Sequence, residues 1–188
     1  MTRFLAAVLL AFSPAFAAAQ GAAVESLGAR RCADLVRAQN EDQTLYAAFG
    51  VWIGGYLSAA NAYEENTFDL TPWQPIELAT LQIAAACRQR QDATIAAATA
   101  SFVSYLKDQR LTESSELILL RGEDRTVSIY RSVLADVRAR LEAGGEIILE
   151  PIGAFGPSFG MALERFQKAN GLPETGLPDT PTLLKLMR

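Results

Sequence analysis

One stretch near the C-terminus decides how the last third of the chain folds: Gly153-Ala-Phe-Gly-Pro-Ser-Phe-Gly-Met-Ala-Leu-Glu-Arg-Phe-Gln167, followed by Lys168-Ala-Asn-Gly-Leu-Pro-Glu-Thr-Gly176 and then by Asp179-Thr-Pro-Thr-Leu-Leu-Lys-Leu186. Pro157 suits the first turn of a helix, where its missing N–H would lack a partner anyway, and Gly171 suits the position after the last turn, where φ is usually positive. Asp179 is a residue type that caps a second helix. The stretch therefore predicts two short helices bounded by turns.

Apolar residues in this stretch fall on one side of each predicted helix. Phe159, Leu163 and Phe166 recur at i, i+4 and i+7, which is the spacing of one helical face. Leu183 and Leu186 offer a second apolar face from the following helix. The two faces predict a small helical core.

The run resembles the C-terminal part of the peptidoglycan-binding-like module of bacterial envelope proteins. That family's pattern is roughly Asp-Gly-x-Phe-Gly-Pro-x-Thr, a helix ending in x-Phe-Gln, then Asn-Gly-Leu-Pro-x-Thr-Gly and a closing Asp-x-x-Thr-Leu. The positions that match in order are Gly153, Phe155, Gly156, Pro157, Phe166, Gln167, Asn170, Gly171, Leu172, Pro173, Thr175, Gly176, Asp179, Thr182 and Leu183. Ile152 and Phe159 depart, because the family usually has Asp and Thr there. The resemblance implies a three-helix module over residues 125–188 with peptidoglycan as its partner.

A shallow groove beside the helix that begins at Pro157 is the natural place for a glycan or stem peptide on such a module. The ligand-binding candidates are Phe155, Ser158, Phe159 and Arg165. Phe159 has a second interpretation as a core residue, because it belongs to the apolar face of the helix.

The first nineteen residues have the pattern of a secretory signal. Arg3 precedes an apolar run from Phe4 to Phe12, and Ala17-Ala18-Ala19 fits an A-x-A cleavage site. The apolar run is too short to span a bilayer, and no later stretch reaches eighteen uninterrupted apolar residues. We therefore expect a signal peptide over residues 1–19, cleavage near Gln20, a periplasmic protein, and no membrane span in the mature chain.

The charge of the chain is acidic. The 17 basic and 21 acidic residues give a net charge of −4, and removing Arg3 with the signal lowers it to −5. Without a cluster of Lys or Arg, this balance argues against nucleic acid and against anionic membrane surfaces as partners.

Cys32 and Cys87 are the only cysteines. An even count in an exported chain predicts a disulfide, and closing a loop of about 55 residues stabilises a fold by roughly 4 kcal/mol in the loop-entropy model. A metal pair and a redox couple are the alternatives. Both are disfavoured, because the chain has no histidine and the spacing is far from Cys-x-x-Cys.

The sequence predicts a four-helix bundle over residues 20–108 that is cross-linked by this disulfide. The predicted fold class is all-α, with two small helical domains. We expect helices over 30–39, 45–63 and 75–88, and a fourth helix that is capped by Asp92. Residues 64–75 are expected to form a loop, in which Trp73 folds back over the core. The clearest stripe consists of Leu45, Phe49, Trp52, Tyr56, Ala60 and Tyr63. Its aromatic residues have two interpretations, as core or as a client-binding surface.

The bundle is also similar to the HdeA-like family of periplasmic all-α proteins. The resemblance is carried by Cys32-Ala-Asp-Leu35, Trp52-Ile-Gly-Gly-Tyr-Leu-Ser-Ala-Ala-Asn61, Ala86-Cys87 and Asp92-Ala-Thr-Ile-Ala-Ala-Ala98. Members of that family include acid-stress chaperones, so the resemblance implies unfolded or envelope proteins as partners. With no histidine, any acid-induced opening would lie below about pH 5, near the pKa of Asp and Glu.

Residues 109–124 are a polar linker in this interpretation. Its apolar run Leu117-Ile-Leu-Leu120 is either a short strand or the edge of a helix, and the pattern does not decide between them. A helical stripe then runs from Val127 through Tyr130 and Leu134 to Leu141, as the first helix of the C-terminal module.

Catalytic chemistry is poorly supplied. Without histidine there is no Ser-His or Cys-His pair and no imidazole metal ligand, and the carboxylates Glu64-Glu65 sit in a polar, solvated turn. No Gly-x-Gly-x-x-Gly or P-loop is present, so we expect no catalytic residues, no metal and no cofactor. The favoured function is a non-catalytic envelope protein that binds peptidoglycan; an acid-stress chaperone is the alternative, and an enzyme is the least favoured class.

Overall fold

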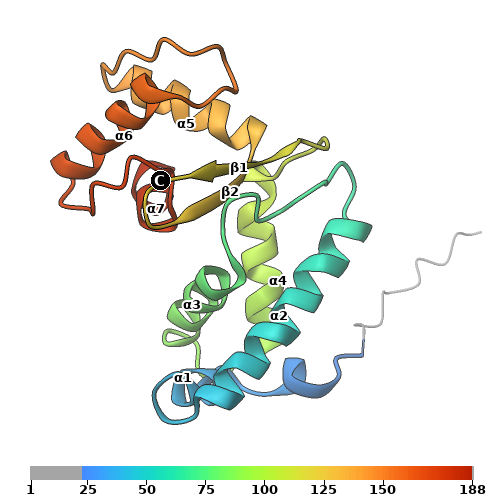
Figure 1. The fold of residues 1–188 in the computed structure, drawn as a ribbon. Helices are drawn as coiled ribbons and strands as arrows, with labels where there is room; N and C mark the ends of the chain where they lie inside the picture. Colours follow the sequence, from blue (N-terminus) through green and yellow to red (C-terminus); the bar gives the residue numbers. More distant parts are fainter. Residues whose placement is uncertain (1–22, 188) are drawn as a thin grey trace, which may run out of the picture.

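The computed structural model describes residues 23–187, so the predicted signal peptide lies outside the described residues. The described chain forms two helical units with a single β-hairpin between them (Figure 1). The all-α prediction is therefore confirmed, with the hairpin as an addition. Within residues 23–187, every helix is too short or too polar to cross a bilayer.

The N-terminal unit is a helical bundle with its own core. It consists of the 3-10 turn Ser26–Ala29 and the helices α1 (Cys32–Glu41), α2 (Gln43–Tyr63), α3 (Ile76–Cys87) and α4 (Ile95–Leu106), followed by a 3-10 turn at Lys107–Gln109. The largest fully buried side chains of this core are Leu35, Phe49, Ile53, Leu70, Ile83, Ile95 and Leu106. Phe49 is thus a core residue, while Trp52 and Tyr56 pack partly buried against the same core.

The predicted disulfide is present. Cys32 begins α1 and Cys87 ends α3, with their sulfur atoms 2.04 Å apart and both side chains buried in the bundle core. The bond therefore ties the start of the bundle to the end of its third helix.

The cap of α4 differs from the prediction. Thr94, not Asp92, is the N-cap, and its side chain accepts a hydrogen bond from the N–H of Ala97. Residues 92–94 cannot begin the helix because they pair with the chain before α1: Cys32 donates its N–H to the Ala93 carbonyl, and Ile95 donates to that of Arg30.

The predicted linker contains the first strand of the hairpin. β1 (Leu117–Arg121) pairs antiparallel with β2 (Thr126–Tyr130), so the run at Leu117 is a strand rather than a helix edge. The prediction that the helix already begins at Val127 is wrong, because α5 spans Arg131–Ala143. Residues 126–129 alternate between exposed and partly or fully buried positions, and Ile129 lies in the core, as expected for a half-buried strand.

The C-terminal unit adds α6 (Pro157–Ala169) and α7 (Thr180–Leu186) to α5 and the hairpin. Gly171 has a φ of 65°, and the Asp179 side chain accepts the Thr182 N–H as N-cap, so the predicted bounds of these helices are confirmed. The buried core of this unit consists of Leu120, Ile129, Val133, Leu134, Val137, Leu141, Ile148, Phe159, Ala162, Leu163, Leu177 and Leu183.

The two units share apolar contacts. Trp73, in the loop between α2 and α3, packs against the C-terminal core instead of folding back over the bundle core, and Leu111 packs beside it. In Figure 1 the hairpin lies between the bundle and helices α5 and α6. A cleft between the units is therefore bordered by residues from both.

Candidate functional site

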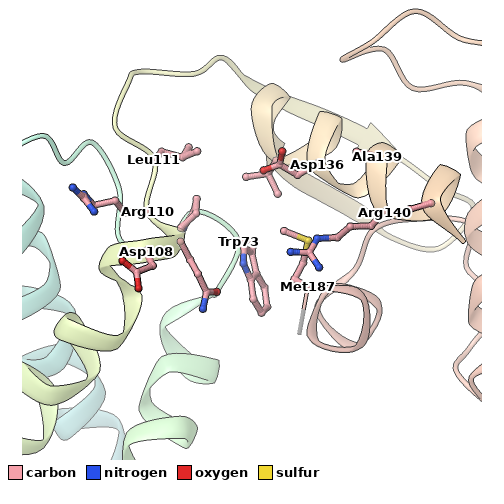
Figure 2. A pocket seen from close by; sticks show the side chains of 12 residues that line it. Trp73, Asp108, Arg110, Leu111, Asp136, Ala139, Arg140 and Met187 are labelled. Atoms are coloured by element: carbon pink, nitrogen blue, oxygen red, sulfur yellow. The ribbon is translucent and has the colours of Figure 1, made fainter.

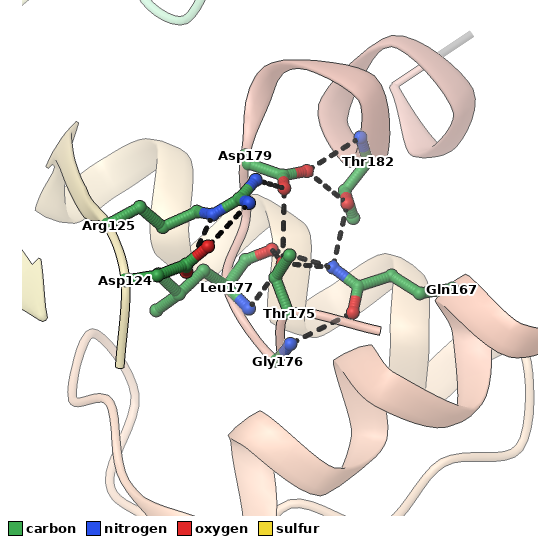
Figure 3. A network of polar contacts seen from close by, with 8 residues as sticks. All are labelled: Asp124, Arg125, Gln167, Thr175, Gly176, Leu177, Asp179 and Thr182. Atoms are coloured by element: carbon green, nitrogen blue, oxygen red, sulfur yellow. Dashed lines mark hydrogen bonds and ion pairs between the residues drawn. The ribbon is translucent and has the colours of Figure 1, made fainter. Parts of the chain in front are cut away.

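The residues that carry the family resemblance form a buried polar network at the turn between α6 and α7 (Figure 3). Gln167 is fully buried, and its Oε1 accepts the N–H of Gly176 at 2.9 Å. Its Nε2 lies 2.9 Å from the Leu177 carbonyl and 2.9 and 3.0 Å from the hydroxyls of Thr182 and Thr175. The glutamine amide thus satisfies the polar groups of a turn that has no strand partner.

Asp179 completes the network. Its carboxylate accepts the Thr182 hydroxyl at 2.6 Å and the Thr175 hydroxyl at 3.1 Å, and Arg125 at the end of the hairpin turn lies 3.5 Å away. Arg125 also binds Asp124, and these hydrogen bonds lower the pKa of the Asp124 carboxyl. The residues that carry the family resemblance therefore hold α6, α7 and the hairpin in place, and most of their polar atoms already take part in internal hydrogen bonds.

A second polar contact fixes the N-terminus of α6. The carboxylate of Glu150 accepts the backbone N–H of Ser158 at 2.9 Å and also its hydroxyl, and Ser158 accepts the N–H of Leu149. The hydrogen bond from Ser158 is the main cause that lowers the pKa of Glu150. Gly156 makes the contact possible, because a Cβ there would lie 2.6 Å from a Glu150 oxygen.

The structure corrects one predicted ligand residue. Phe159 is 0% exposed in the C-terminal core, so it cannot contact a ligand in this conformation, and the alternative interpretation as core is the correct one. Phe155 is half-buried and packs on Phe159 with ring centroids 5.5 Å apart. Ser158 is committed to Glu150, and exposed Arg165 binds Glu146 at 2.8 Å. Phe155, Ser158 and Phe159 lie around the start of α6, Arg165 lies in its second half, and most of these side chains are engaged in internal contacts.

A concave surface lies between the two units. A cleft of about 550 Å³ opens between the loop before α3, the segment 108–111 that follows α4, helix α5 and Met187 (Figure 2). Its lining includes Pro72, Trp73, Asp108, Arg110, Leu111, Asp136, Ala139, Arg140 and Met187. Trp73 stands near the middle of the cleft in Figure 2, with the Arg140 guanidinium and Met187 beyond it. None of the four predicted ligand residues lines this cleft.

The charged groups of the cleft are lightly engaged. Within the part of the chain that the structure describes, the Arg140 side chain donates one hydrogen bond, to the Leu186 carbonyl at 3.2 Å. Within residues 23–187, no ion pair involves Arg140, Asp136 or Asp108. Arg110 is different, because it binds the backbone carbonyls of Asn66 and Lys107.

Sequence reasoning missed this cleft, since its residues come from four distant segments. The one local signal was Trp73 itself, an aromatic residue within Thr71-Pro-Trp-Gln-Pro75, a short segment with a proline on each side of Trp73. Pro72 and Trp73 also border a second cavity of about 440 Å³ on the side of β2 and α7. Trp73 thus borders both the cleft and the second cavity.

The comparisons with known proteins support the C-terminal resemblance. Residues 134–186 match the family model described as "Putative peptidoglycan binding domain". This part of the chain is similar to peptidoglycan-binding domains. No curated protein and no solved structure matches the chain. The HdeA-like resemblance of the bundle has no support from these comparisons and stays a prediction.

The match and the disulfide together indicate an extracytoplasmic location in the cell envelope. Disulfides persist in oxidising compartments, and the polymer that the matched family is named for lies outside the cytoplasmic membrane.

Proposed function

We propose that the protein is an exported, non-catalytic envelope protein of the periplasm that binds peptidoglycan through its C-terminal module. The observation that carries the proposal is the match of residues 134–186 to the peptidoglycan-binding family. Export after cleavage of residues 1–19 agrees with the Cys32–Cys87 disulfide. The absence of histidine from the sequence favours a binding role over hydrolysis.

The test is sedimentation of the chain from Gln20 to Arg188 with purified insoluble peptidoglycan at moderate salt, beside a turbidity assay for wall lysis. We expect the protein in the pellet and an unchanged turbidity. The entire chain is needed, because a fragment that begins at residue 125 would lose β1 and the contact with Trp73. Protein left in the supernatant would mean that the module has the fold of the matched family but does not bind peptidoglycan. A fall in the turbidity of the wall suspension would refute the non-catalytic role.

The alternative is an acid-stress chaperone that acts through the bundle on unfolded or envelope proteins. One observation favours it: a groove of about 690 Å³ lies between α2 and α3, lined by Tyr46, Val51 and Ile76 among others, and Val51 is 78% exposed. This function requires more apolar dye to bind at pH 3 than at pH 7, and slower aggregation of a client at pH 3. Equal dye binding at both values would exclude an acid-triggered role.

A further inference from the structure

We infer that the cleft between the bundle and the C-terminal module binds the peptide stem of peptidoglycan, with Trp73 as its apolar platform and Arg140, Asp136 and Asp108 as its charge partners. This inference rests on the proposed function and adds the ligand class and the site. Two of the four residues, Trp73 and Asp108, lie outside the region that matches the peptidoglycan-binding family.

The position and size of the cleft suit a small ligand. Sites of this kind lie preferentially between domains and enclose about 300–1,000 Å³. The cleft lies between the two units and encloses about 550 Å³. Its walls belong to α5 and the C-terminus on one side and to the segments around Trp73 and Asp108 on the other (Figure 2).

Trp73 supplies a rigid aromatic surface. The residue before it, Pro72, is buried and lines the same cleft, whereas the Trp73 side chain is only partly buried against the C-terminal core. A tryptophan held in this way offers a flat apolar face with little rotamer entropy left to lose, and such residues dominate binding energetics. The Met187 side chain lies nearby in Figure 2 and extends the apolar surface.

Arg140 differs from its neighbours in the module. Most arginines there pair with carboxylates, namely Arg125, Arg131, Arg138 and Arg165. Among the hydrogen bonds of residues 23–187, the Arg140 side chain makes only the one to the Leu186 carbonyl, although a guanidinium has five donors. Asp136 lies one turn earlier on α5, a spacing that favours an ion pair with Arg140, yet the ion pairs of the described residues do not include it. Both side chains border the cleft, so each can bind a ligand charge of the opposite sign.

The two signs of charge select the peptide stem over the glycan strand. Stem peptides carry free carboxylates and, on their diamino residue, an ammonium group, whereas the strand of N-acetylated sugars is neutral. Arg140 can hold a carboxylate in bidentate geometry, and Asp136 and Asp108 can accept the ammonium. A neutral oligosaccharide can offer hydroxyls to these groups but no opposite charge, so its hydrogen bonds to them would be the weaker kind.

The experiment uses the chain from Gln20 to Arg188 with its disulfide intact, and two soluble probes: a tetrapeptide stem and a neutral chitin oligosaccharide. The chain has two tryptophans, so Trp52→Phe leaves Trp73 as the sole indole reporter. We expect the stem peptide, and not the oligosaccharide, to change the Trp73 emission in a saturable way. Arg140→Gln and Asp136→Asn should each weaken binding about tenfold or more, because each removes a charge-assisted hydrogen bond. Arg121→Gln is the matched control, an exposed arginine of β1 outside the cleft, and should change the affinity less than twofold.

The outcomes separate the two proposals. If the chain sediments with peptidoglycan while both cleft variants sediment equally well and Trp73 emission stays constant, the cleft inference fails and the wall-binding proposal stands. If the oligosaccharide changes the emission and the stem does not, the ligand class is wrong. If the chain neither sediments nor responds to the stem, both proposals fail. Arg140 and Asp136 are exposed, so their variants test the site without disturbing the core.

Discussion

Replacing Gln167 with methionine tests whether the family signature is structural. Methionine keeps the length of the side chain but removes its hydrogen bonds. The N–H of Gly176, which is buried, would lose the acceptor that holds it at 2.9 Å, at a cost of about 1–3 kcal/mol. In the variant, the Leu177 carbonyl still accepts the Asp179 N–H, which lies 2.8 Å away, and the Thr182 and Thr175 hydroxyls still donate to the Asp179 carboxylate. Loss of the amide's own bonds adds about 1 kcal/mol, which gives a total of about 2–4 kcal/mol.

Urea denaturation measures this loss. Circular dichroism follows all helices, and Trp73 emission in a Trp52→Phe background reports the C-terminal core that it packs against. With an m value of about 1 kcal/mol per M for a unit of this size, the C-terminal midpoint should fall by about 2 M or more. Lys168→Met is the matched control, one residue along the same helix and exposed, with an expected change within about 0.5 kcal/mol. Equal midpoints for the two variants would refute the structural role of Gln167.

Three further outcomes are expected. Replacing Cys32 and Cys87 with serine should destabilise the bundle by roughly 4 kcal/mol in urea, and an unchanged bundle transition would contradict the loop-entropy argument. Glu150→Gln should lower the melting temperature most at pH 7, because hydrogen bonds hold the folded-state pKa of Glu150 below its unfolded value. The stabilisation of the folded state by this carboxylate is present above the unfolded pKa of about 4.3 and is lost as the pH falls through the folded-state pKa. A difference from wild type that persists at pH 2 would argue against this role. Gly176→Ala should destabilise the C-terminal unit by about 1 kcal/mol or more, because φ is +62° and the new Cβ would lie 3.0 Å from Glu164, and a thermal melt like that of wild type would show that the turn adapts.

Local signals predicted most of the helices. Pro157, Gly171 and Asp179 determine the ends of α6 and α7 through backbone chemistry that depends on a few neighbouring residues, so the sequence alone was enough. The hairpin was harder to predict. Val127 and Tyr130 fit both a helical stripe with Leu134 and a strand, and pairing with β1 decides the outcome.

The site was less accessible from the sequence. The sequence predicts Phe159 as a groove residue because it is an aromatic residue of the helix that begins at Pro157. Its i, i+4 spacing with Leu163 equally indicates a core position, which is where it lies. Trp73 and Arg140 come together only through the packing of two units, and no periodicity or spacing in the sequence encodes that contact.

The contact of Trp73 with the C-terminal core limits how the module can be transplanted. Binding modules are often fused to unrelated proteins as independent cassettes. Here part of the apolar surface of the module is covered by Trp73 and Leu111, which belong to segments before the hairpin. A fusion that carries only residues 134–186 would expose that surface to solvent and invite aggregation. For this chain, the transferable part is larger than the part that the family match covers.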